Sequence, residues 1–161
     1  MQKEISSILE YNPLTGIIFN KSTGNFLSLL EDGWVCFKSP ITQKQTKMKM
    51  NKLCFSLGYS EDVEKNQKVI HKNLDETDFR LNNLACLDPD DYKIYKEALK
   101  NLQGGIKLTP HPKDIGAYRL SWFSGGIKKT RLVEDIVVAK RLETRLKLKY
   151  SKILSRYTVS D

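Results

Sequence analysis

Residues 69–84, with the sequence VIHKNLDETDFRLNNL, contain His71, one of the two histidines of the chain, among several carboxylate and amide side chains. A histidine titrates near neutral pH and can act as a general base, and carboxylate or amide oxygens can bind a divalent metal ion. His71 is therefore the first candidate for acid–base chemistry, although a histidine hydrogen-bonded within a loop explains it equally well. His111, between Pro110 and Pro112, is interpreted as a loop residue.

The basic residues are distributed unevenly along the chain. Residues 1–100 carry 14 basic and 14 acidic side chains, whereas residues 101–161 carry 13 basic and 5 acidic ones, so the net charge of +8 arises in the last segment. Such a confined excess is typical of a surface that binds a polyanion, although a solvated basic helix face is the simpler alternative. The predicted partner is duplex DNA. Its candidate contacts are Lys107, Arg119, Ser121, Lys128, Lys129, Arg131, Arg141, Arg145 and Lys149.

The composition excludes several classes of protein. An apolar content of 40% and a charged content of 29% are ordinary for a folded domain. No apolar run approaches the roughly 18 to 20 residues of a membrane span, and the first residues do not resemble a signal peptide, which predicts a cytoplasmic protein. Three scattered cysteines without a Cys-x-x-Cys pair predict reduced core residues and no zinc site. The sequence contains no Gly-rich phosphate loop and no Gly-x-Ser-x-Gly motif.

The first hundred residues predict a small β-rich part followed by one helix. A turn with proline and glycine over residues 11–16 precedes a short apolar run, and two later stretches have the pattern of strands. Asp88 can cap a helix whose first residue is Pro89, and the following acidic residues favour the positive end of its dipole. The predicted strands are residues 17–19, 34–38 and 46–50, and the predicted helix is residues 89–102.

The last part of the chain predicts a sheet and then one long helix. Tyr118, Leu120 and Trp122 alternate with polar or basic residues, and a Ser-Gly-Gly turn at residues 124–126 would return the chain as a partner strand. From Leu132 onward, apolar residues recur with helical spacing as far as residue 157. We expect this apolar stripe to pack on the face of Tyr118, Leu120 and Trp122. A second, basic stripe with the same spacing consists of Arg141, Arg145, Lys149, Lys152 and Arg156.

Three stretches resemble known families. The sequence YNPLTGIIF at residues 11–19 resembles the Tyr-Asp-Pro-x-Thr-Gly opening of phage-type HNH homing endonucleases. Residues 69–84 resemble the central motif of that family, Val-Asp-His-x-Asn-Gly-Asp-x-x-Asp-Asn-Arg-x-x-Asn-Leu. Residues 105–141 are similar to the sheet-and-helix DNA-binding module of plant ethylene-response factors, which many such nucleases carry at the C-terminus. The resemblance covers most of the chain and implies a ββα-metal core, a phage or mobile-element origin and duplex DNA as the partner.

The resemblance also implies which residues would perform the chemistry. In the family, a histidine at the end of a strand removes a proton from water, and a divalent metal stabilises the leaving oxygen. His71 matches the base, and Asn83 matches the asparagine that braces the loop. Ile70, however, occupies the position of a metal-binding carboxylate, and Tyr92 occupies the position of the second ligand. Neither side chain can bind a hard cation, so we expect no metal cofactor. Only if the protein is an active nuclease would Mg²⁺ or Mn²⁺ be its cofactor.

Smaller departures from the family motif point the same way. Leu74 replaces the glycine of the tight turn, Phe79 replaces the asparagine before the arginine, and Asn51-Lys52 stands where the family has His-Arg. The acids that could rebuild a metal site are Asp75, Asp88 and Asp91.

The sequence therefore predicts an α+β protein of two domains. Residues 1–103 would form a β-rich domain with an HNH-like core, and residues 104–161 would form a basic module with a three-stranded sheet packed on one long helix. The predicted function is duplex-DNA binding by an HNH-endonuclease-like protein that has lost, or nearly lost, metal-dependent cleavage. One alternative is an active nicking endonuclease with unusual metal ligands. The other is a nuclease fold repurposed as an inhibitor or accessory subunit of a host or phage protein complex.

Overall fold

The computed structural model describes residues 2–40 and 42–158. The chain divides into two compact units, of which the first extends to Pro89 and the second comprises Asp90–Tyr157. Over the described residues, four α-helices accompany several small antiparallel sheets, which confirms the predicted mixture of helices and strands. None of the helices described is long and apolar enough to cross a membrane.

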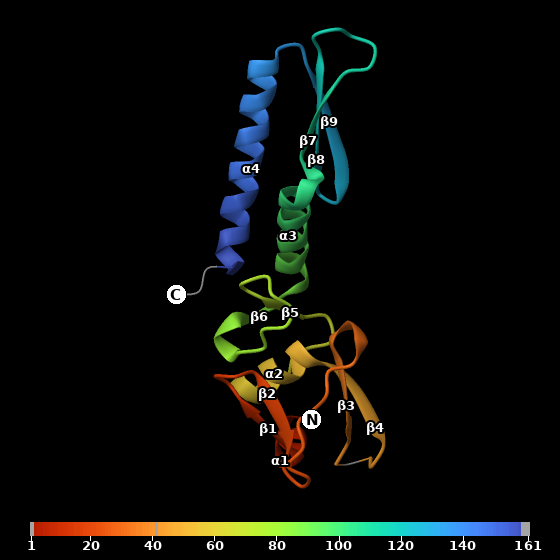
Figure 1. Ribbon diagram of the computed structural model, residues 1–161, viewed down its shortest axis with the longest axis vertical. Coiled ribbons are helices and arrows are strands. Elements are labelled where there is room, and N and C mark those ends of the chain that lie inside the picture. Colours follow the sequence, from red (N-terminus) through yellow and green to blue (C-terminus); the bar gives the residue numbers. More distant parts are fainter. Residues whose placement is uncertain (1, 41, 159–161) are drawn as a thin grey trace. The chain divides into compact units, whose positions relative to one another are not determined.

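The first unit consists of three β-hairpins and two helices (Figure 1). Each hairpin pairs two strands that are consecutive in the sequence, and short 3-10 turns precede the strands at Trp34 and Leu84. The elements are α1 (Gln2–Ile8), β1 (Leu9–Asn12), β2 (Ile17–Asn20), β3 (Trp34–Lys38), β4 (Gln45–Lys49), α2 (Met50–Tyr59), β5 (Lys68–His71) and β6 (Leu84–Leu87).

Helix α2 contributes fully buried residues to the core of the first unit. Leu53 and Cys54 are 0% exposed and belong to one cluster with residues of α1 and of the hairpins. Burial raises the pKa of the Cys54 thiol to about 12, and all three cysteines are free thiols. The first unit contains the strands of the predicted β-rich beginning, but its helices α1 and α2 were not predicted. Helix α2 has no side-chain cap at Lys49, and the alternating pattern of β4 runs directly into it.

The second unit contains two helices and a three-stranded antiparallel sheet in the order β7-β8-β9. A short π-helical turn, Asn101–Gly105, joins the first helix to the sheet. The side chain of Asn101, which is 1% exposed, donates to the carbonyls of Glu97 and Phe123 and accepts from the Phe123 N–H. The elements are α3 (Pro89–Lys100), β7 (Lys107–Pro110), β8 (Tyr118–Ser124), β9 (Ile127–Val133) and α4 (Ile136–Thr158).

The core of this unit lies between the sheet and the helices. Leu120 and Tyr150 are buried in one cluster with Ala98, and Trp122 packs against this cluster together with residues of α4. The predicted packing on the long helix is thus confirmed for Leu120 and Trp122, whereas Tyr118, which was expected on the same face, is not part of this cluster. Ala98 of α3 belongs to this core, so the second compact unit includes α3.

The long helix begins later than its apolar spacing predicted. Leu132 and Val133 belong to β9, where they pair with Arg119 and Tyr118. Asp135 then caps the helix, since its carboxylate accepts the backbone N–H groups of Val137 and Val138 at 2.6 and 2.9 Å. The apolar spacing that predicted the helix therefore began at Leu132, a residue that continues the strand β9.

Candidate functional site

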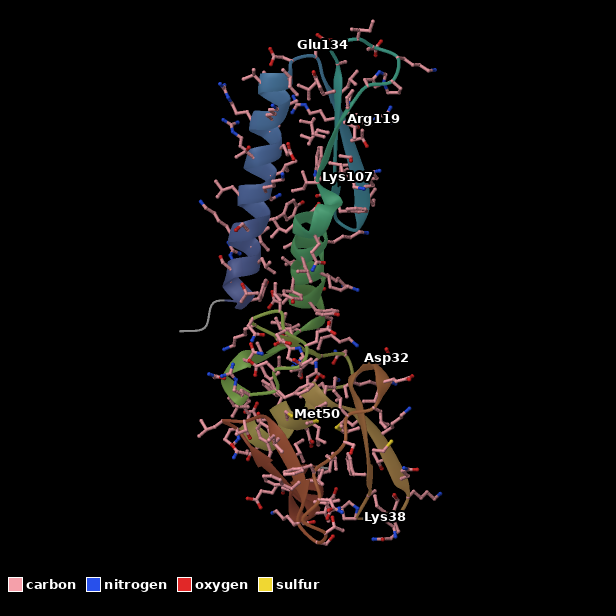
Figure 2. The ribbon with its side chains drawn as sticks, in the orientation of Figure 1. Asp32, Lys38, Met50, Lys107, Arg119 and Glu134 are labelled. Atoms are coloured by element: carbon pink, nitrogen blue, oxygen red, sulfur yellow. The ribbon has the colours of Figure 1, made fainter. Side chains whose placement is uncertain are left out.

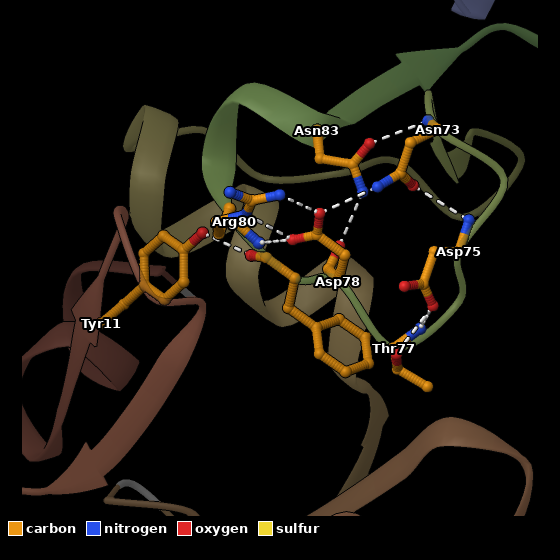
Figure 3. Close-up of polar contacts among 8 residues, drawn as sticks. Tyr11, Asn73, Asp75, Thr77, Asp78, Arg80 and Asn83 are labelled. Atoms are coloured by element: carbon orange, nitrogen blue, oxygen red, sulfur yellow. Dashed lines mark hydrogen bonds and ion pairs between the residues drawn. The ribbon is translucent and has the colours of Figure 1, made fainter.

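The loop after His71 is held by its own polar side chains (Figure 3). Asn83, which is 4% exposed, accepts the backbone N–H of Asn73 at 2.9 Å and donates its amide to the carbonyl of Asp78 at 2.8 Å. The Asn73 amide in turn donates to the Asp78 carboxylate at 2.9 Å. Asn83 thus makes the bracing contacts that the resemblance implies for it.

Arg80 closes the same network through a two-pronged ion pair. Its Nε and Nη2 donate to the two oxygens of Asp78 at 2.8 and 2.6 Å, and only 11% of the Asp78 side chain is exposed. These hydrogen bonds lower the pKa of Asp78 to about 2. Thr77 similarly donates to Asp75 through its hydroxyl and its backbone N–H, which lowers the pKa of that carboxyl. These acids are engaged within the loop.

The turn at residues 11–16 docks on the far end of this loop. The Tyr11 hydroxyl donates to the Phe79 carbonyl at 2.7 Å, and the Leu81 N–H donates to the Pro13 carbonyl at 3.0 Å. Burial raises the pKa of Tyr11. Gly16 has φ +75°, and a β-carbon there would lie 2.7 Å from the carbonyl carbon of Phe79. The two stretches that carry the resemblance to nucleases therefore contact each other directly, which their separate motifs did not reveal.

The imidazole of His71 is enclosed. The residue is 9% exposed, and its Nε2 is buried without a hydrogen-bond partner among the described residues. The Phe79 ring packs edge-on against it, with 5.4 Å between ring centroids. Burial is the main cause that lowers the pKa of His71, against the weaker opposing effect of the loop acids. The arrangement favours a neutral imidazole that is shielded from water.

The positions next to His71 are also apolar or engaged. Ile70 is 5% exposed and, because side chains alternate along a strand, it lies on the face of β5 opposite to that of His71. Leu74 has φ +64°, so it keeps the left-handed backbone that glycine would adopt more readily. Asn51, which was aligned with a histidine of the resembled nucleases, donates its amide to the Val69 carbonyl at 2.7 Å.

The candidate replacement ligands have other partners. Asp88 accepts from the Gln67 amide at 3.1 Å, and Asp91 accepts from the Tyr157 hydroxyl at 2.9 Å. Tyr92 stacks on Tyr95 with ring centroids 6.3 Å apart. Over residues 2–40 and 42–158, no group of three or more His, Cys, Asp or Glu side chains is arranged to hold a metal ion.

The second candidate site is the sheet of the second unit, where the strand register determines which side chains share a face. Ser124 pairs with Ile127 across a two-residue Gly125-Gly126 turn, so odd-numbered residues of β8 lie opposite even-numbered residues of β9. Directly opposed residues in an antiparallel pair point to the same side of the sheet. The face that does not contain Leu120 and Trp122, here called the outer sheet face, therefore carries Lys107, Thr109, Arg119, Ser121, Phe123, Lys128, Thr130 and Leu132.

This register divides the predicted DNA contacts between two faces. Lys107, Arg119 and Lys128 are exposed on the outer sheet face, and Figure 2 labels the first two on neighbouring strands. Lys129 and Arg131 instead lie opposite Trp122 and Leu120, on the side of the sheet that packs against α4. The expectation that Arg119, Ser121, Lys129 and Arg131 form one surface is therefore not met.

Ser121 also differs from expectation in its exposure. The residue is 6% exposed, because its short side chain lies on the central strand between Lys107 and Thr130. Sequence reasoning missed Thr109 and Thr130, which the register places beside the cations of the outer sheet face. The remaining predicted contacts, Arg141, Arg145 and Lys149, are exposed on α4.

Comparison of the chain with protein-family models, with curated proteins and with solved structures gives no match.

Proposed function

We propose that the protein binds duplex DNA through the outer sheet face of its second unit, and that its first unit is an HNH-endonuclease-like domain without cleavage activity. The observation that carries the proposal is the composition of this face. Three exposed cations and two exposed hydroxyl side chains, those of Thr109 and Thr130, lie on three adjoining strands, and the register places no carboxylate among them. Cationic and hydroxyl groups are the side chains that contact phosphates and base edges in protein–DNA complexes.

The shape of the surface suits the major groove. That groove, about 12 Å wide, admits a two-stranded ribbon, and β8 and β9 form such a ribbon over seven residue pairs. Arg119 is the exposed cation of the central strand, so it is the candidate for a bidentate contact with guanine. Lys107 and Lys128 lie on the outer strands and are the candidates for phosphate contacts.

The absence of cleavage is proposed from the surroundings of His71. A general base must reach a water molecule, whereas the Nε2 of His71 is buried and the Phe79 ring covers the imidazole. The family's metal-binding carboxylate is replaced by the buried, aliphatic Ile70. The polar loop keeps its bracing contacts, which supports a nuclease-like loop structure around a site that does not cleave DNA.

Two assays of the full chain test the proposal. Fluorescence anisotropy with a labelled 20-base-pair duplex should show binding that weakens steeply with salt, because each phosphate contact releases a counterion. Supercoiled plasmid with Mg²⁺ or Mn²⁺ should remain intact for the wild type and for His71→Ala. Metal-dependent nicking that His71→Ala abolishes would make the protein an active nuclease, and absence of duplex binding would refute the DNA-binding assignment.

A further inference from the structure

Helix α4 carries a row of cations that lies apart from the outer sheet face. The row, here called the α4 basic row, spans about 22 Å of helix at 1.5 Å per residue. Glu143 is the only acid of α4, and it pairs with Lys147 at 2.7 Å. None of the cations in the row has an ion pair with another described residue. The row consists of the exposed residues Arg141, Arg145, Lys149, Lys152 and Arg156.

The direction of this row follows from the packing of α4. The apolar stripe that contains Leu142, Leu146 and Ile153 faces the core and therefore the side of the sheet that carries Leu120 and Trp122. At 100° per residue, the α4 basic row is centred roughly 100° around the helix from that stripe. It consequently points sideways from α4 and not through the sheet toward its outer face.

Two cations of β9 lie close to the side toward which the α4 basic row points. Lys129 and Arg131 lie on the α4 side of the sheet, yet both are exposed, whereas Leu120 beside them on β8 is 1% exposed. Helix α4 therefore covers the central strand and leaves the β9 edge open. Helix α4 is right-handed, and β9 lies beside β8 in the sheet. For these two reasons the α4 basic row lies on the side of α4 that is nearer the open β9 edge.

We propose that Lys129, Arg131 and the α4 basic row form a second nucleic-acid surface, which holds a second duplex segment while the outer sheet face holds the first. This inference rests on the proposed DNA binding. The two surfaces lie on opposite sides of the sheet. DNA has a persistence length of about 150 base pairs, so one duplex would have to bend sharply within about one helical turn to contact both. Two separate segments avoid this deformation, and the protein then bridges them.

A bridging assay with the full chain tests the second surface. One 20-base-pair duplex is immobilised on beads, and capture of a second, fluorescent duplex is measured beside the anisotropy of a single duplex. The double variant Lys129→Glu with Arg145→Glu should lower capture about tenfold and change single-duplex affinity by less than about threefold, because it removes contacts of the second surface only. The variant Arg119→Glu should lower single-duplex affinity itself.

A matched control carries the same change of charge elsewhere in the unit. Lys113 lies in the loop before β8, and Lys140 lies on the flank of α4 away from the basic row. The double variant Lys113→Glu with Lys140→Glu should retain both capture and affinity. Circular dichroism of each variant shows whether its fold is retained.

Each of the following outcomes would overturn the inference. Capture that persists in Lys129→Glu with Arg145→Glu places the bridge elsewhere. A loss of single-duplex affinity equal to that of Arg119→Glu shows that both surfaces hold one duplex. An equal loss of capture in the control variant shows a general effect of charge. If the wild type binds a single duplex but captures no second one, only this inference fails. If the wild type binds no duplex at all, the proposed function fails as well.

Discussion

The polar loop after His71 in the first unit and the basic surface of the second unit use their polar groups in opposite ways. In the loop of the first unit, hydrogen bonds of 2.6 to 2.8 Å join Asp78 to Arg80 and Asn83, and His71 is buried against the ring of Phe79. In the second unit, cations such as Arg119 and Arg145 extend from the sheet and from α4 without a carboxylate partner among the described residues. A polar network that is closed on itself stabilises a loop, whereas unpaired cations remain available for a ligand. We infer a structural role for the first set, and the proposed function gives the second set a binding role.

The largest expected effect concerns packing in the second unit. Trp122→Ala removes a large aromatic side chain that packs against the cluster of Leu120 and Tyr150. We expect the free energy of unfolding of this unit to fall by about 3 to 4 kcal/mol, measured by urea denaturation. Ile127→Ala is the control in the same sheet, since Ile127 is 62% exposed and its loss should change little. Equal effects of the two substitutions would mean that Trp122 does not pack in the core.

The next effect tests the docking of the turn on the loop in the first unit. Gly16→Ala adds a β-carbon at φ +75° within 2.7 Å of the Phe79 backbone and 2.9 Å of the Arg80 nitrogen. Backbone strain and steric overlap together should cost about 3 kcal/mol of stability. Gly24→Ala has φ +69° with no atom within 4 Å, so it should cost only the strain, about 1 kcal/mol. A similar cost at both positions would contradict the close contact at Gly16.

A smaller effect is expected on DNA binding. Arg119→Ala should weaken duplex affinity by about 1 to 3 kcal/mol if Arg119 contacts a guanine edge, and by less if it contacts phosphate. Arg80→Ala, which removes an arginine of the first unit that is 52% exposed, should leave affinity unchanged because Arg80 is paired with Asp78. Anisotropy titrations at fixed salt distinguish the two variants. A larger loss of duplex affinity in Arg80→Ala than in Arg119→Ala would contradict the binding role proposed for the second unit.

The smallest effect is a pH dependence from His71. Burial holds the pKa of His71 in the folded chain below its usual value of 6.5, so the unfolded chain takes up a proton first as the pH falls. The stability of the first unit should therefore decrease on acidification from pH 7 toward pH 5. Denaturation followed by the fluorescence of Trp34, in a Trp122→Phe background, measures this slope. His71→Phe should flatten it, and an unchanged slope would show that His71 is not the titrating group.

The sequence predicted those elements that have a local signal, such as an alternating residue pattern in a strand or a proline at the start of a helix. The strand at residues 34–38 was predicted with the bounds of β3, and Pro89 marked the start of α3 because proline suits the first turn of a helix. The bracing role of Asn83 followed from the resemblance and agrees with its contacts. Helix α2 was missed because it has neither a capping side chain nor a break before it.

The division of the sheet between two faces could not be predicted in the same way. Alternation within β8 shows that Arg119 and Leu120 point to opposite sides, but it does not show which residues of β9 accompany each of them. The pairing depends on the length of the turn, and a register shift of one residue exchanges the faces. The enclosure of His71 likewise depends on Phe79, eight residues away, and on how the intervening loop folds.

Because the strand register depends on the length of the turn at Gly125-Gly126, a mutation that changes this length would change the register. Both glycines have positive φ, 61° and 77°, as a two-residue hairpin turn requires, and this turn fixes the pairing of every residue of β9. Insertion or deletion of one codon there could move Lys129 and Arg131 to the outer sheet face and Lys128 to the side of α4. A single small mutation would thus redistribute the charge of the module without altering any charged residue. If the protein binds DNA as proposed, homologous genes that differ at this turn are expected to differ in how they contact DNA, even where their basic residues are identical.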